Sequence, residues 1–176
     1  MKYLFAFLFT LICVLSQAQL RRTSPPVQIA KVVRIIDGDT FEVIHNFQKT
    51  IWRTNGYDAP ELKQPFGQQA ADSVSKFVYN RIIRAFVIEK DLFQRNIVII
   101  SHISNKPCNL DSLIIRNGWA WSRKGWRGKD YNLLQDPNQQ RAITEHKGLW
   151  QCSNPILPNL WRRMNAQTKI ISNTCN

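Results

Sequence analysis

Acidic residues are scarce in this 176-residue sequence: 12 Asp and Glu stand against 24 Lys and Arg, and the formal net charge is +12. A small protein with this charge attracts polyanions, because neutralising phosphates releases condensed counterions. The charge alone does not separate a nucleic-acid-binding protein from a merely soluble basic protein. That distinction must come from motifs.

Histidine and cysteine are scarce as well. The histidines are scattered along the chain: His45, His102 and His146. No spaced set of Cys and His residues indicates zinc, and the sequence gives no support to a nuclease that binds its metal through a histidine on a hairpin. Three cysteines follow the N-terminal region and are compatible with one disulfide and one free thiol, in any of three pairings: Cys108, Cys152 and Cys175.

Long apolar runs are absent except at the N-terminus, where Leu4 to Leu15 follow Lys2 and precede Ser16-Gln17-Ala18. This order of charge, apolar run and small-residue cleavage site is typical of a secretory signal peptide, so we assign residues 1–18 to one. An uncleaved anchor is the alternative, although the run is short for a membrane span. We expect export to the periplasm or the medium, with no membrane attachment after cleavage.

The mature chain is predicted to form one domain. Residues 19–26, with Pro25-Pro26, look like a flexible leader, residues 27–161 form the domain, and residues 162–176 form a C-terminal tail. The segment 155–176 shows little periodicity, which we interpret as a docked tail with a frayed end. We expect a monomer.

Short runs rich in Val, Ile, Phe and Trp predict five strands: Val27 to Ile36, Phe41 to His45, Lys49 to Arg53, Ala85 to Lys90 and Asn96 to His102. Asp37-Gly38 joins the first two and is a strong hairpin signal, because glycine accepts a positive φ.

About three helices are predicted. Between Pro65 and Ile83 the apolar residues follow a helical period: Ala70, Val74, Phe77, Val78 and Ile82. Asn109 caps a short helix that Gly118 closes. A third helix runs from about Tyr131 to Lys147, or begins at Asp136-Pro137. Five strands with a helix between the third and fourth predict an α+β, mainly β fold, the five-stranded Greek-key OB-fold barrel.

The few carboxylates are concentrated in one region. Five of the 12 lie within 25 positions: Asp37, Asp39, Glu42, Asp58 and Glu61. Their mutual repulsion is unfavourable unless a cation or arginines offset it. Oxygen-only ligands favour calcium or magnesium.

Three blocks carry a resemblance to a known family. Ile36 to Thr40 (IDGDT), Arg53 to Glu61 (RTNGYDAPE) and Asp91 to Arg95 (DLFQR) follow one another in the sequence. They resemble the Asp-Gly-Asp-Thr hairpin, the Arg-x4-Asp-x-Pro-Glu block and the Asp-x-Tyr-Gly-Arg segment of the thermonuclease (staphylococcal-nuclease-like) family. With supporting matches as far as Gly148-Leu149-Trp150, the resemblance covers about Val32 to Trp161.

Each block has a simpler interpretation when it is taken alone. Asp37-Gly38 is a hairpin turn, Arg53 and Glu61 form a surface ion pair beside a turn proline, and Arg95 is a solvated residue at a strand start. The order and spacing of all three blocks favour the family.

The resemblance implies a calcium site. Asp39 and Asp58 would bind Ca²⁺ together with the main-chain carbonyl of Ala59, and Asp37 and Thr40 would support these ligands from outside the coordination shell.

It also implies the catalytic residues. Arg53 and Arg95 would bind the phosphoryl oxygens, and Glu61 would orient or deprotonate the attacking water. A member of the family would be an endonuclease that cuts DNA and/or RNA and leaves 3′-phosphate ends.

Some positions depart from the family pattern. Phe93 and Gln94 replace the usual Tyr and Gly before Arg95, which alters the turn presenting that arginine. The nucleotide-contacting tyrosines of the family have no clear counterpart. A basic and aromatic segment could contact nucleic acid instead: Trp121, Arg123, Lys124 and Trp126. Packing tryptophans are the alternative for Trp121 and Trp126, and we assign Trp119, Trp150 and Trp161 to packing.

Two other functions compete with a nuclease. A catalytically weak OB-fold nucleic-acid-binding protein would have lost the acids and arginines that this sequence retains. An oligosaccharide or peptide binder of the same fold would explain neither the positive charge nor two arginines beside a carboxylate cluster.

Overall fold

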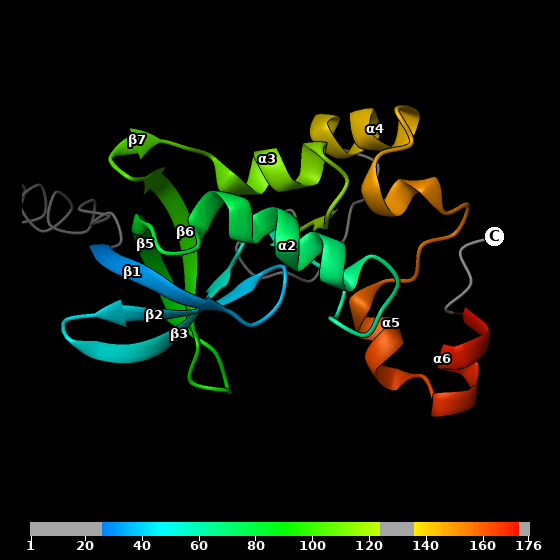
Figure 1. Ribbon diagram of the computed structural model, residues 1–176, viewed down its shortest axis with the longest axis horizontal. Helices are drawn as coiled ribbons and strands as arrows, with labels where there is room; N and C mark the ends of the chain where they lie inside the picture. The colour runs from blue at the N-terminus through cyan, green and yellow to red at the C-terminus, as the bar shows by residue number, and fades with distance from the viewer. Residues whose placement is uncertain (1–25, 124–135, 173–176) are drawn as a thin grey trace, which may run out of the picture.

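The structure, a computed structural model, describes residues 26–123 and 136–172 (Figure 1). The expected signal peptide and almost all of the leader lie outside the described residues, as do Lys124 and Trp126. In the described part, no helix is long and apolar enough to cross a membrane.

Five strands close into a barrel, as the sequence predicts (Figure 1). They are β1 (Val27–Ile35), β2 (Thr40–His45), β3 (Gln48–Thr54), β5 (Ile82–Lys90) and β6 (Asn96–Ile103). The sheet order is β3-β2-β1-β5-β6, and a parallel pairing of β3 with β6 joins its two edges. The other neighbours are antiparallel, so the fold is the OB-type Greek-key barrel.

The barrel interior is filled by the alternate residues of these strands. Val32, Phe41, Val43, Trp52 and Val98 are completely buried. The period-2 pattern of the strands turns these apolar residues inward. Between β2 and β3 the chain turns through Asn46 and Phe47, both with positive φ, in the manner of a two-residue hairpin.

Helix α2 (Gly67–Val78) follows the very short strand β4 (Tyr57–Asp58). Ala70, Val74 and Val78 are buried, which confirms the predicted apolar face. The prediction was wrong for Ile82, which lies in β5 and is 52% exposed. The helix ends before Asn80, whose positive φ turns the chain into β5.

Beyond the barrel strands come β7 (Lys106–Pro107), α3 (Leu110–Arg116) and β8 (Trp121–Ser122). The predicted caps of α3 are confirmed: the Asn109 side chain accepts a hydrogen bond from the backbone of Ser112, and Gly118 has φ 74°.

Helix α4 (Pro137–Thr144) and the 3-10 helix η1 (Gly148–Gln151) complete this region. The later of the two predicted starts for α4 is correct for the described residues, because Asp136 is its N-cap and Pro137 its first residue.

The C-terminal segment is more structured than predicted. It forms α5 (Pro158–Arg163) and α6 (Ala166–Ser172), which lie on the side of the molecule away from the β2–β3 hairpin (Figure 1). The described residues therefore contain five α-helices, not about three. The expected boundary between domain and tail falls inside α5.

The described cysteines differ in state. Cys108 is a free thiol, whereas Cys152 is disulfide-bonded. This excludes the two pairings that use Cys108. Cys175 lies outside the described residues.

Gly38 is required for a different reason than the sequence suggests. It lies in the β1–β2 connection as predicted, but it is not among the residues with positive φ. A Cβ at this position would lie 2.6 Å from the Cβ of Ala59 and 3.3 Å from that of Ala70. The glycine therefore allows three segments, the β1–β2 connection, the chain after β4 and helix α2, to approach closely.

We expect Gly38→Ala to destabilise the fold by about 1–3 kcal/mol, because the added methyl group overpacks this contact. Thermal unfolding of the variant measures the loss. Ala59→Gly removes the nearest colliding atom, so the double variant should recover part of the lost stability. Additive losses in the double variant would contradict the close-approach explanation.

Candidate active site

The β1–β2 connection is a tightly hydrogen-bonded loop at one end of the barrel. The Asp39 N–H donates to Asp37 Oδ1 at 2.9 Å, and the Thr54 N–H donates to the Asp39 carbonyl at 2.9 Å. The buried Tyr57 hydroxyl donates to the Gly38 carbonyl at 3.0 Å. These bonds fix the Asp39 side chain toward the chain after β4, where its Oδ2 accepts from the Ala59 N–H at 3.1 Å.

Arg53 joins two of the predicted ligand carboxylates. It lies opposite Thr40 in the β2–β3 ladder, which places its guanidinium beside the Asp39 side chain. Its Nη1 is 2.7 Å from Asp39 Oδ1, and its Nη2 donates to Asp58 Oδ1. Asp39, Asp58 and Arg53 are only 2%, 1% and 8% exposed. Charges buried to this extent need such partners.

The pKa values follow from this burial. Burial raises the pKa of Asp39 to about 6 against the opposing effect of Arg53, and the Asp37 charge adds to the increase. Burial works to lower the pKa of Arg53, but the carboxylates of Asp39 and Asp58 outweigh it and raise this pKa above its ordinary value. At neutral pH the Arg53 guanidinium is therefore charged, and the Asp39 carboxyl is mostly ionised.

Asp58 is placed by a small second sheet. In this sheet β4 pairs with β8, and Asp58 lies opposite Trp121. The Ser122 N–H donates to Gln139 Oε1 at 2.8 Å, and the Ser122 hydroxyl donates to Asp136 Oδ2 at 2.6 Å. Helix α4 thus supports β8, which in turn holds the backbone of Asp58.

The interpretation of Trp121 as a base-stacking residue is corrected by this arrangement. Its ring is 2% exposed and packs edge-on against Trp150, with 6.1 Å between ring centroids. A base can stack only on an open aromatic face, so the packing alternative holds for Trp121.

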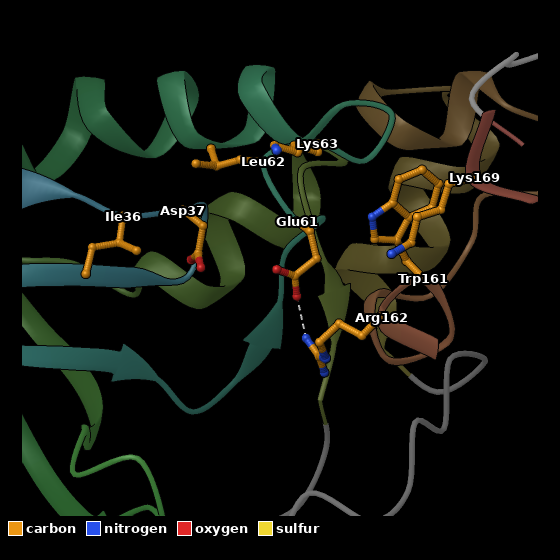
Figure 2. A pocket seen from close by; sticks show the side chains of 8 residues that line it. All are labelled: Ile36, Asp37, Glu61, Leu62, Lys63, Trp161, Arg162 and Lys169. Atoms are coloured by element: carbon orange, nitrogen blue, oxygen red, sulfur yellow. Dashed lines mark hydrogen bonds and ion pairs between the residues drawn. The ribbon is translucent and has the colours of Figure 1, made fainter. Parts of the chain in front are cut away.

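Glu61 lies in the turn between β4 and α2. The Gln64 side chain accepts from the Glu61 N–H at 3.1 Å, and the Gln64 N–H donates to the Glu61 carbonyl at 2.8 Å. The Glu61 side chain is half-buried, and its Oε1 accepts from Arg162 of helix α5 (Figure 2). Its other oxygen has no hydrogen bond from the described residues.

Arg95 projects from the turn between β5 and β6. Its Nε and Nη2 each lie 2.7 Å from Asp91 Oδ2, and its guanidinium carbon lies 5.2 Å from the Phe93 ring centroid. Partial burial works to raise the pKa of Asp91, but hydrogen bonds from the Arg95 side chain and backbone outweigh it and lower this pKa. Gln94 adopts φ 62°, so, contrary to the expectation from the sequence, the replacement of glycine leaves the left-handed turn in place.

An open pocket of about 420 Å³ collects these groups. Its lining contains Arg123, from the predicted nucleic-acid-binding segment, and five of the predicted metal-site and catalytic residues: Asp37, Arg53, Asp58, Glu61 and Arg95. Asp39 and Thr40 lie behind this surface, where the Thr40 hydroxyl donates to Asp39 Oδ1 at 2.7 Å. With Arg162, which also lines the pocket, the site combines four arginines and three carboxylates. Such a site can bind an anion and a cation together.

The side-chain donors of the site are oxygen atoms, which would suit a hard cation such as calcium. Asp39 and Asp58 offer carboxylate oxygens within reach of the same guanidinium, Asp37 adds a third negative charge, and hard cations prefer oxygen ligands. In residues 26–123 and 136–172 no three His, Cys, Asp or Glu side chains are arranged to bind a metal by themselves. Main-chain oxygen and water would therefore complete the coordination, as calcium allows.

Two functional neighbours were missed in the sequence. Arg162 lies 101 residues from Glu61. The only signal for a role of this residue in the sequence is the basic pair Arg162-Arg163. Gln64 supports the Glu61 turn, and its side chain also donates to the Ile156 carbonyl in the segment before α5. Gln64 directly precedes Pro65, where the predicted helical period begins, but no local pattern connects it with Ile156.

Comparisons with known proteins agree with the geometry. Residues 51–152 match the model of the family described as staphylococcal nuclease homologue. An uncharacterised endonuclease of Haemophilus influenzae is 34% identical, with 76% of this chain and 72% of the relative covered. The micrococcal nuclease of Shigella flexneri is 28% identical, with 76% and 79% covered, and the protein ParB of Escherichia coli is 30% identical, with 76% and 78% covered.

The family match extends over more than half of the chain, and the Haemophilus influenzae relative is similar over most of its length. The matched region includes Arg53, Asp58, Glu61 and Arg95. The chain therefore belongs to the staphylococcal nuclease homologue family.

Proposed function

We propose that this protein is an exported, calcium-dependent endonuclease that hydrolyses phosphodiester bonds of DNA and/or RNA and leaves 3′-phosphate ends. The observation that carries the proposal is the single pocket into which Arg53, Glu61 and Arg95 converge beside Asp58. Family membership and the relatives named as nucleases support the reaction class.

Each arginine keeps donors available for a phosphate. A guanidinium has five N–H donors. Arg53 directs Nη1 and Nη2 toward the carboxylates of Asp39 and Asp58, and Arg95 directs Nε and Nη2 toward Asp91. The remaining N–H groups can donate to the nonbridging oxygens, where negative charge increases as the transition state forms.

Glu61 is suited to accept a proton from water. Its second carboxylate oxygen has no hydrogen bond from the described residues, while Arg162 and the turn with Gln64 hold the side chain in place. The water oxygen bonds to phosphorus, its proton passes to Glu61, and the bond from phosphorus to the 5′-oxygen breaks. Arg95 stabilises the charge on that leaving oxygen, which takes a proton from solvent water and becomes the 5′-hydroxyl. Bound calcium would supply Lewis-acid polarisation of the phosphate and a template for its orientation.

The first prediction concerns the metal and the products. Plasmid and single-stranded DNA should be cleaved with calcium present and should remain intact in excess chelator. Magnesium should support binding more than turnover, because a flexible oxygen site suits the larger ion. The fragments should accept label from a polynucleotide kinase without phosphatase treatment, since their 5′ ends are hydroxyls.

Full cleavage in excess chelator would contradict the proposed calcium dependence. Failure of kinase labelling would contradict cleavage of the bond between phosphorus and the 5′-oxygen. Tight binding of DNA without cleavage under any metal would favour the second candidate, a catalytically weak OB-fold nucleic-acid-binding protein.

The second prediction concerns the arginines. Arg95→Ala and Arg53→Ala should each lower kcat by roughly a hundredfold or more with a smaller change in KM, because their contacts strengthen in the transition state. Arg53→Ala should also destabilise the fold by roughly 3–5 kcal/mol, since it leaves two buried carboxylates unpaired. Thermal unfolding separates the two effects.

Arg81→Ala is a matched control, because Arg81 is exposed and lies in the turn after α2, outside the pocket. A variant of Arg95 or Arg53 that changed only KM would show that the arginine merely attracts substrate.

The third prediction separates the base from the metal ligands. Glu61→Gln keeps the size and the hydrogen-bonding capacity of the side chain but removes the basic oxygen, so kcat should fall at least about a hundredfold. Calcium affinity, measured by calorimetry, should fall only modestly. Asp39→Asn should weaken calcium binding more. The reverse order of calcium affinities would exchange the two assignments.

A further inference from the structure

A second pocket, of about 460 Å³, adjoins the candidate active site. It shares Asp37, Glu61 and Arg162 with the first pocket. Figure 2 shows Glu61 between the barrel loop that carries Asp37 and the C-terminal helices that carry Arg162 and Lys169. A chain that leaves the active site past Glu61 therefore enters this second pocket directly.

The charge of the second pocket suits an anion. Lys63 enters it from the turn after Glu61, and Lys169 enters it from α6. Neither lysine forms an ion pair with a carboxylate in the described part of the chain. The Arg162 charge is balanced by Glu61, and one oxygen of Asp37 accepts from the Asp39 backbone. The positive charges of Lys63 and Lys169 therefore outnumber the one remaining negative charge, that of Asp37, and can bind an anion.

The same pocket also has an apolar side. Ile36, Leu62 and Trp161 contribute to its lining, and Leu62 is 44% exposed. The Lys169 ammonium lies 5.5 Å from the centroid of the Trp161 ring, which keeps the lysine head group at the pocket. Apolar walls with a few converging charges match the sugar and base of a nucleotide as well as its phosphate.

We propose that this pocket is a binding subsite for the nucleotide next to the scissile phosphate, with Lys63 and Lys169 as its phosphate-binding residues. The inference rests on the proposed function and adds a role for the C-terminal helices. Helix α6 supplies Lys169, and helix α5 supplies Arg162, which lines both this pocket and the candidate active site. A single strand bound across the active site would then occupy both pockets.

The test uses the full chain in excess chelator, so that binding is measured without cleavage. A ten-nucleotide single-stranded DNA with a fluorescent label serves as the probe, and anisotropy gives its Kd. The double variant Lys63→Ala/Lys169→Ala should weaken binding by roughly fivefold to tenfold at about 0.1 M salt. The slope of log K against log salt should decrease by about 1.4, because two phosphate contacts to a single strand are lost.

The control variant, Lys31→Ala/Lys106→Ala, removes the same charge from exposed lysines of β1 and β7 that line neither pocket. It should bind within about twofold of the unmodified chain. The pair Lys63→Arg/Lys169→Arg keeps the charge and should restore binding. Thermal unfolding shows whether each variant is folded.

Unchanged binding by the Lys63/Lys169 alanine variant, or an equal loss in the control variant, would overturn the subsite. This outcome is distinct from failure of the proposed function, which appears as absence of cleavage by the unmodified chain in calcium.

Discussion

The contact of Arg53 with Asp39 and Asp58 is the constraint on which the rest of the site depends. A buried carboxylate is strongly unfavourable unless it is paired and hydrogen-bonded, and here two of them share one guanidinium. Substituting Arg53 alone would be strongly destabilising, because it leaves the buried carboxylates of Asp39 and Asp58 without their shared positive charge. Its position then determines where the other residues can act.

The barrel provides the register that this contact needs. Arg53 lies opposite Thr40 in the antiparallel ladder and opposite Ile97 in the parallel pairing that closes the barrel. A shift of one residue in β3 would turn its side chain to the other face. Asp58 comes to the same point through the separate β4–β8 pairing. The positions of Arg53 and Asp58 are therefore determined by the register of the strand pairs that contain them.

Much of this could be predicted from the sequence because the signals are local. Alternating apolar residues predicted the barrel strands, and the three motif blocks predicted five side chains that line the pocket. The short helices α5 and α6 have too few residues to show a period. Trp121 was ambiguous, because its burial depends on Trp150, which lies 29 positions later. The contact of Arg162 with Glu61 joins residues that no local pattern connects.

The two sides of the pocket differ in how strongly they are held. Asp39, Asp58 and Arg53 are buried, whereas Glu61, Arg95 and Arg162 are partly exposed and paired with one another or with Asp91. Exposed ion pairs typically contribute only about 0–1 kcal/mol, so an incoming phosphate can compete for these donors at little cost.

The buried pairs resist such exchange, because separating them exposes uncompensated charge to a poorly solvating interior. A phosphate that enters the pocket therefore meets a fixed wall on one side and adjustable arginines on the other. Under the proposed function, the fixed wall would set the geometry of the reaction, and the partly exposed arginines would adapt to the substrate as its charge redistributes.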